Sequence, residues 1–212
     1  MDKATTSFSP DAPGAVRYAL DRLRSELPRH LYYHNALHTE ADVLPAAVRL
    51  ARLSQLAEPD IRLLEVAAAF HDLGQVKRFL GHEQIGADIV SVTLPRYGFG
   101  AQDIERIKGM ILATELPQTP LNYEQELLCD ADLDSLGRDD FFATSKALWQ
   151  ERKACGVDVP WPLWLETQYQ FLHTHLYFTP VARELRNAGK QKNLELLERL
   201  MRGESVPGCD IE

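Results

Sequence analysis

Hydrophobic residues recur at steps of three and four along most of this chain, which is the spacing of one buried face of an α-helix. The clearest stripe is Ile61, Leu64, Ala68 and His71, and it stops close to Gly74. The chain carries neither convincing alternating strand patterns nor Asn-Gly or Asp-Gly hairpin turns. The pattern therefore predicts an all-α protein, with helices at about residues 16–27, 43–53, 61–71, 82–92, 104–111, 127–137, 139–153, 166–187 and 191–201.

These helices are expected to form a single domain. A length of 212 residues suits one domain with a sizeable core. Residues 157–162 contain two prolines and form a connector that is short for a domain boundary. We expect a helical domain at 12–202, with its C-terminal helices at 163–202, between a flexible N-terminus at 1–11 and a flexible tail at 203–212.

Composition narrows the class of protein. Hydrophobic residues make up 45% and charged residues 25% of the chain, as in soluble globular proteins. No apolar run approaches the roughly 18 residues that span a bilayer. Residues 1–10 lack the apolar core of a signal peptide, so we expect a cytoplasmic protein that does not contact a membrane. The three cysteines are widely spaced, which predicts reduced thiols.

Charge bears on the partners. A formal charge of −8 argues against a broad basic face for duplex nucleic acid. It does not exclude a small phosphorylated substrate, because a bound divalent cation can reverse the local field at one site. Whether the chain forms a homodimer is left open by its sequence.

The strongest chemical signal is a histidine followed by an aspartate at the end of an apolar helix. His71 continues the inward stripe, and Asp72 follows the apolar run at 66–70. A buried carboxylate is costly unless it is paired or binds a metal. The dipeptide alone is a weak signal, because a core histidine can instead bond a carbonyl group and Asp72 could cap the helix.

Two further segments supply candidate ligands. His34 and His38 are four residues apart and would share a helix face if that stretch is helical. Asp130 and Asp132 follow an apolar run, and periodicity does not choose between them. Two histidines and two aspartates form a hard ligand set, which suits Mg²⁺, Mn²⁺, Fe²⁺ or a catalytic Zn²⁺ with open water positions.

The order of these residues resembles the H…HD…D pattern of the HD superfamily of metal-dependent phosphohydrolases. The sequence segments around these residues match as well, namely YHNALHT at 33–39, AAAFHDLG at 67–74 and LLCDADLDSLG at 127–137. The resemblance spans about residues 30–140. It implies an all-α HD-domain bundle whose divalent metal is held by His38, His71, Asp72 and Asp130.

The segment at 33–39 is also similar to the corresponding segment of the cyclic-nucleotide phosphodiesterases, which are distant HD relatives. There the second histidine binds metal and the first protonates the leaving oxygen, so His34 would be a general acid; the alternative is that it orients a ligand. In HD proteins with two metals, a histidine near His82 serves the second ion, but this chain has Ala113, Thr114 and Glu115 where a further histidine is expected. The resemblance thus implies one ion per chain, with His82 bonding a bound water or phosphate.

The implied function is hydrolysis of a phosphomonoester or phosphodiester, expected to be that of a nucleotide, by metal-activated water. Asp72 or Asp130 would position or deprotonate the water, and His34 would protonate the departing oxygen. Two alternatives stay open: a nucleotide-sensing regulatory module without useful turnover, and a di-iron oxygenase on the same scaffold. Candidates for phosphate contacts, although such residues more often belong to solvated faces, are Lys77, Arg78 and Arg138.

Overall fold

The computed structural model describes residues 9–206 and residue 209, and within that part of the chain it contains helices and no strand. Its α-helices are α1 (Ala12–Glu26), α2 (Leu44–Leu53), α3 (Glu58–Phe70), α4 (His82–Thr93), α5 (Ala101–Ala113), α6 (Tyr123–Asp132), α7 (Phe141–Ala154), α8 (Trp161–Thr174) and α9 (Pro180–Met201). The short helical turns are η1 (His38–Val43), which is π-helical, and the 3₁₀ turns η2 (Leu73–Val76), η3 (Leu94–Tyr97) and η4 (Asp134–Gly137). The prediction of an all-α protein is confirmed.

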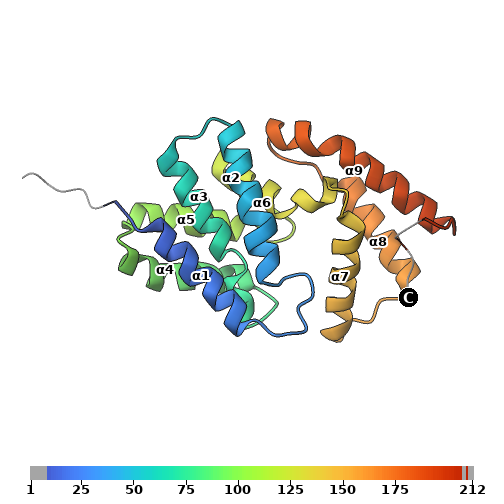
Figure 1. Cartoon of the computed structure of the whole chain (residues 1–212), viewed down its shortest axis with the longest axis horizontal. Coiled ribbons are helices and arrows are strands. Elements are labelled where there is room, and N and C mark those ends of the chain that lie inside the picture. Colours follow the sequence, from blue (N-terminus) through green and yellow to red (C-terminus); the bar gives the residue numbers. More distant parts are fainter. Residues whose placement is uncertain (1–8, 207–208, 210–212) are drawn as a thin grey trace, which may run out of the picture.

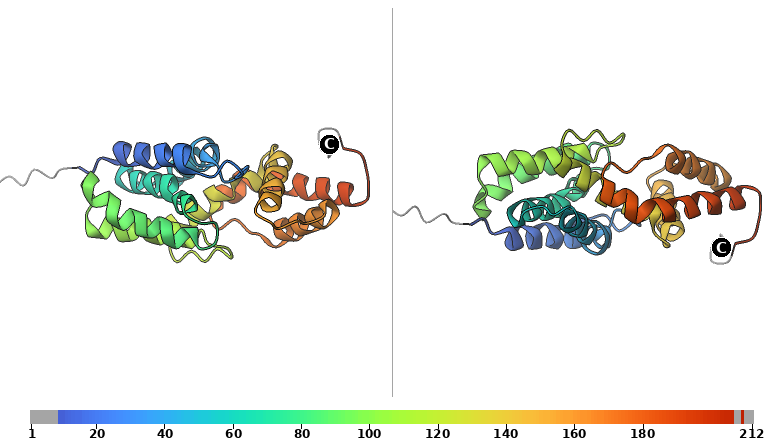
Figure 2. Two further views of the ribbon diagram at one scale, coloured as in Figure 1. Left: turned by 90° about the horizontal axis from the view of Figure 1, so that it is seen from below. Right: turned by 90° about the horizontal axis from the view of Figure 1, so that it is seen from above.

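The helices form two groups that lie side by side along the longest axis of the molecule (Figures 1 and 2). We call α1–α6 the N-terminal half and α7–α9 the C-terminal half. Turn η4 links them, and α9 packs back against it. Fully buried apolar side chains fill the N-terminal half, among them Leu50, Leu64, Phe70 and Ile111.

Helix α3 directs the His-Asp pair into this core. Pro59 lies in its first turn, and Glu58 and Asp60 complement the positive end of the helix dipole there. Every residue from Val66 to Phe70 is buried, so α3 is enclosed on all sides at its C-terminal end. His71 and Asp72 therefore leave the helix inside the molecule.

The chain ends are partly described. The Asp11 carboxylate accepts a hydrogen bond from the Gly14 amide at 2.9 Å and caps α1. Val206 and Cys209, within the predicted tail at 203–212, are buried against the hydrophobic core. The flexibility predicted for 1–11 and for the tail falls largely outside the described residues and stays a prediction.

The C-terminal helices differ from the prediction of one helix at 166–187 and another at 191–201. The chain breaks instead at 175–179 and then runs as the single helix α9. The Thr179 hydroxyl accepts a hydrogen bond from the Ala182 amide, and Pro180 occupies the first turn, which together start a new helix. Gly189, which lies between the two predicted helices, sits inside α9 because it allows close packing against η4.

Gly189 is expected to be sensitive to substitution. A Cβ atom there would lie 2.0 Å from the carbonyl oxygen of Gly137, and backbone cannot move aside cheaply. We expect Gly189→Ala to lower the free energy of unfolding by about 2 kcal/mol or more, measured by chemical denaturation. Gly109→Ala, in the interior of α5, is the matched control, since its Cβ would meet only the flexible side chain of Gln125. That control should be neutral or stabilising by up to about 1 kcal/mol; equal losses would contradict the explanation.

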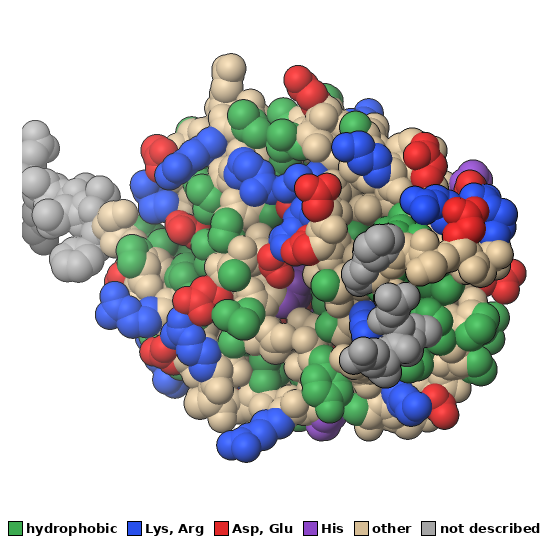
Figure 3. All heavy atoms as spheres, turned by 45° about the vertical axis from the view of Figure 1, so that its right-hand side comes forward, with side chains coloured by type: hydrophobic (Ala, Val, Ile, Leu, Met, Phe, Trp, Pro, Cys, Tyr) green, Lys and Arg blue, Asp and Glu red, His purple; other side chains and the backbone are tan. Residues whose placement is uncertain are grey.

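The surface carries mixed charges. On the face drawn in Figure 3, basic and acidic side chains are interleaved, and histidine is visible in a recess between the two halves. None of the helices within residues 9–206 is long and apolar enough to cross a membrane.

Candidate active site

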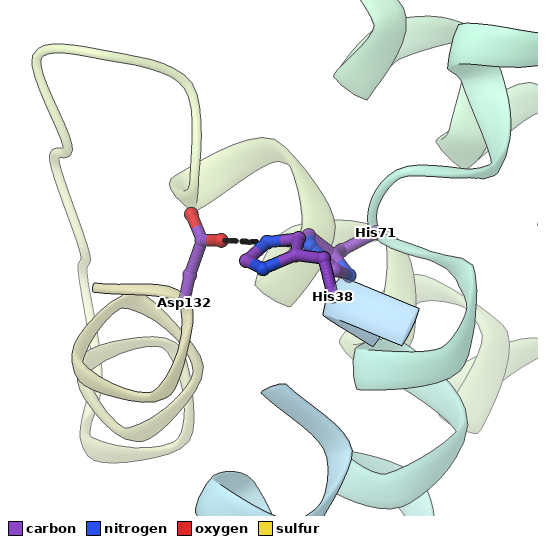
Figure 4. A group of neighbouring side chains, drawn as sticks. All are labelled: His38, His71 and Asp132. Carbon is purple, nitrogen blue, oxygen red and sulfur yellow. Dashed lines mark ion pairs between the residues drawn. The ribbon is translucent and has the colours of Figure 1, made fainter. Parts of the chain in front are cut away.

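Three side chains from separate stretches of the chain converge: His38 from η1, His71 directly after α3, and Asp132 at the end of α6 (Figure 4). Asp132 Oδ1 lies 3.4 Å from His38 Nε2 and 3.5 Å from His71 Nε2. One ligand atom from each residue lies within 4.8 Å of the other two. Two ligands of one ion, each bonded at about 2.1 Å, stand about 3–3.5 Å apart. The group therefore has the dimensions of a metal site.

The ring of His71 is held by its own helix. Its Nδ1 lies 2.7 Å from the carbonyl oxygen of Ala68. Because a carbonyl oxygen can only accept, Nδ1 carries the proton and Nε2 presents a lone pair to the cluster. Such a bond fixes both the tautomer and the orientation of a ligating histidine.

Asn35 organises the turn that delivers His38. Its Oδ1 accepts hydrogen bonds from the amides of Leu37 at 2.8 Å and His38 at 3.3 Å, which starts the helical stretch. His34 precedes this start and lies in a bend, so the helix on which it would share a face with His38 does not extend to it. The two rings nevertheless meet edge to face, with centroids 5.9 Å apart.

Asp72 joins this cluster to His82. Its Oδ2 lies 3.3 Å from His71 Nε2 and 3.8 Å from His38 Nε2. Its Oδ1 accepts from His82 Nε2 at 3.1 Å and from Gln75 Nε2 at 3.0 Å. Since His82 Nδ1 donates to the Phe79 carbonyl at 2.9 Å, both ring nitrogens of His82 face acceptors. Burial lowers the pKa of His82, but the bond to Asp72 outweighs it and the pKa is raised.

The cluster leaves buried polar atoms without partners. His38 Nε2, His71 Nε2 and Asp72 Oδ2 make no hydrogen bond among the described residues. Buried polar atoms are normally satisfied, and two inward lone pairs beside carboxylates form the donor set of a divalent cation. Burial lowers the pKa of His71, but the negative charges of Asp72 and Asp132, at 3.3 and 3.5 Å from its Nε2, raise it well above its usual value. The residues present thus fit a metal ion.

The aspartate of the cluster is Asp132, and the implied ligand Asp130 is corrected. The Asp130 carboxylate accepts hydrogen bonds from the Phe178 amide at 2.8 Å and from the Thr179 amide and hydroxyl at 2.8 and 2.6 Å. Residues two apart on a helix differ by about 200° in direction. The two side chains therefore leave α6 on nearly opposite sides, and Asp130 anchors the start of α9.

Asp134 has a third role. It is buried and forms two hydrogen bonds of 2.7 Å with the guanidinium of Arg186 on α9. Arg49 on α2 donates to the same carboxylate at 2.9 Å. Asp130 and Asp134, on either side of the candidate metal ligand Asp132, thus tie this segment to the start of α9 and to Arg186 within it.

Glu151 of α7 is a site residue that sequence reasoning missed. It is fully buried, and its Oε1 lies 2.5 Å from His34 Nδ1, while its Oε2 accepts from the amides of Tyr33 and His34 at 2.9 Å each. Nδ1 therefore donates, and His34 Nε2 has no hydrogen-bond partner among the described residues. Burial lowers the pKa of His34, but the bond to Glu151 and the charge of Asp72 raise it.

A cavity of about 400 Å³ opens from the cluster towards the C-terminal half. His34, His71, Asp72, His82 and Asp132 line its inner end. Its outer part lies between α7 and α8 and is mostly apolar. The volume lies within the range of small-molecule sites.

The predicted phosphate contacts are not brought to this cavity. Lys77 and Arg78 are exposed in the loop before α4, and neither lines it. Arg138 pairs with Asp42 at 2.5 Å and with Asp140, so its charge is already matched. Among the described residues, the one lysine or arginine that lines the cavity is Arg152, which the sequence analysis did not select.

Residues 41–135 match the model of the HD domain, a stretch that includes His71, Asp72 and Asp132 and begins just after His38. This stretch of the chain is an HD domain. No curated protein is significantly similar to it in sequence. The family match and the histidine–aspartate cluster support a metal-dependent HD-type hydrolase in general.

Solved structures share the fold of this HD protein over both halves. A predicted HD superfamily hydrolase from an uncultured Thermotogales bacterium has a TM-score of 0.63 at 17% identity, covering 92% of this chain and 93% of its own. YpgQ of Bacillus subtilis, solved in complex with ADP, has a TM-score of 0.61 at 21% identity, covering 93% and 100%. A Lactobacillus plantarum protein has a TM-score of 0.67 at 17% identity, covering 91% and 97%. These identities show a common fold.

Proposed function

We propose that this HD protein is a metal-dependent phosphohydrolase that cleaves a phosphomonoester or phosphodiester of a nucleotide. The observation that carries the proposal is the set of unpartnered buried atoms, His38 Nε2, His71 Nε2 and Asp72 Oδ2, beside Asp132 at the inner end of a cavity. Hard nitrogen and oxygen donors facing a cavity are typical of a hydrolytic metal centre.

His38, His71, Asp72 and Asp132 would hold one divalent ion. When bound, such an ion supplies Lewis-acid chemistry, by lowering the pKa of a water and polarising a phosphoryl oxygen. The other residues act around it. His34 lines the cavity, and its Nδ1–H donates to Glu151, which favours the protonated ring whose Nε2–H could give its proton to the departing oxygen. His82 and Gln75 hold Asp72 through Oδ1, so that Oδ2 points to the two ligand histidines.

Two observations support a nucleotide as the substrate. The cavity combines a polar end, suited to a phosphate, with an apolar end between α7 and α8 that is suited to a larger organic group. A structural neighbour, YpgQ, was solved with ADP. Arg152 is the one lysine or arginine on the wall among the described residues, and Glu83 and Glu115 also line it. A wall with one basic and two acidic side chains beside the cluster favours substrates that carry few phosphate groups.

Metal dependence tests the proposal directly. Protein purified without chelator should contain about one divalent ion per chain by elemental analysis. It should release phosphate or a nucleoside from some member of a panel of nucleoside monophosphates and cyclic or linear phosphodiesters. Chelation should abolish this turnover and Mn²⁺ should restore it, because the proposed hydrolysis depends on a water activated by an ion bound to these atoms.

Three results would contradict the proposal. Turnover that survives complete removal of metal would exclude the mechanism. Stabilisation by nucleotides without hydrolysis of any ester would favour a regulatory module. Two irons per chain with no phosphoester cleavage would favour an oxygenase.

A further inference from the structure

The outer part of the cavity is built by α7 and α8. Phe141 and Leu148 of α7 line it together with Trp164 and Phe171 of α8. Trp164 is buried, and its indole Nε1 donates to the Ser145 hydroxyl at 3.1 Å, which fixes the ring. We call this part of the cavity the apolar slot, because aromatic and aliphatic side chains dominate its wall, the kind of surface on which aromatic rings pack.

One polar side chain in this slot has no partner. Gln168 is only 7% exposed and lines the cavity, yet its amide makes no hydrogen bond among the described residues. Its polar neighbours are satisfied: Thr144 and Thr167 each donate to a carbonyl of their own helix at 2.8 Å. A side-chain amide offers two donors and an acceptor, and that of Gln168 is left for a molecule in the cavity to bind. Gln168 interrupts the buried stripe of α8, Trp164, Leu165 and Leu172, where a hydrophobic residue would otherwise be expected.

We propose that Gln168 reads the edge of a nucleobase that packs against Phe171 in the apolar slot. This rests on the proposed function, which supplies a nucleotide. A side-chain amide places a donor beside an acceptor, and nucleobase edges present the complementary pair. An acyl chain would leave the amide unpaired, and a polyphosphate would meet a wall with little positive charge. Arg152 also lines the cavity, and its guanidinium carbon lies 5.9 Å from the centroid of the Trp164 ring.

Binding of free nucleosides tests this inference apart from hydrolysis. A nucleoside has no phosphoester, so the metal-loaded protein can be titrated with adenosine, guanosine, cytidine and uridine by calorimetry. At least one should bind, and Gln168→Leu should weaken it about 10- to 100-fold by removing the paired hydrogen bonds. The matched control is Gln170→Leu, two positions along the same helix and exposed to solvent, which should change nothing. No binding of any nucleoside, or equal effects of both substitutions, would overturn the inference.

Two further experiments distinguish recognition of the base by hydrogen bonds from simple packing and from an effect on catalysis. Gln168→Glu keeps the shape but removes both donors, so it should alter the ranking of the four bases; an unchanged ranking would overturn the inference. If esters are cleaved, Gln168→Leu should lower kcat/KM for the preferred nucleotide and spare phenyl phosphate, which has no hydrogen-bonding edge. Nucleoside binding that depends on Gln168 without hydrolysis would refute the proposed function and leave this inference standing. Hydrolysis without any role for Gln168 would do the reverse.

Discussion

Replacing Asp132 by asparagine is expected to remove the bound metal and to lower turnover by at least about 10³-fold. Its Oδ1 lies within 3.5 Å of Nε2 of both His38 and His71, so it is the negative ligand common to the two histidines. Metal activation contributes several kcal/mol to the transition state, and about 1.4 kcal/mol is a factor of ten in rate. Elemental analysis after dialysis and turnover on the best ester of the panel measure the two effects.

Asp130→Asn is the matched control, with the same change of charge two residues earlier. It removes part of a set of three hydrogen bonds to the start of α9, so it should destabilise the fold by about 1–3 kcal/mol. Metal content and turnover of the folded protein should stay close to wild type. The opposite result, with metal lost from Asp130→Asn and kept by Asp132→Asn, would contradict the assignment made from the structure.

The choice between these aspartates shows where sequence reasoning stopped. Residues 130, 132 and 134 alternate with apolar positions, and each is partly or fully buried. Their roles depend on what lies opposite each one: the start of α9, the two histidines, and two arginines from α2 and α9. Those partners come from distant parts of the chain. Periodicity accordingly left the choice open, and the resemblance selected the wrong member of the pair.

Features set by local chemistry were predictable. The hydrophobic stripe that ends in His71 predicted α3 and the inward direction of His71 and Asp72, because all the residues of this pattern lie on one helix or directly after it. Glu151 is the opposite case, since it meets His34 across 117 residues. It stands beside Gln150, Arg152 and Lys153, which read together as a solvated helix face. Nothing local marks it as the fully buried residue of that group.

Removing the imidazole of His34 is expected to cost about 10²- to 10⁴-fold in kcat on a nucleotide ester, the usual contribution of a general acid. Its Nε2 faces the cavity while Glu151 holds Nδ1. His34→Asn should therefore keep its metal, because His34 is not among the converging ligands. Glu151→Gln should lower kcat by about 10- to 100-fold, since it weakens the support of the ring. His30→Asn, at an exposed histidine nearby, should have no effect.

The leaving group decides between the two roles open to His34. An alkoxide leaves a nucleotide ester slowly without a proton, whereas a nitrophenolate is a good leaving group and needs none. If His34 is the proton donor, His34→Asn should impair the nucleotide ester far more than the nitrophenyl ester. Equal losses on both esters would mean that His34 only orients His38, whose ring it touches. Glu151→Gln should follow the same selectivity, because its carboxylate acts on substrate only through His34.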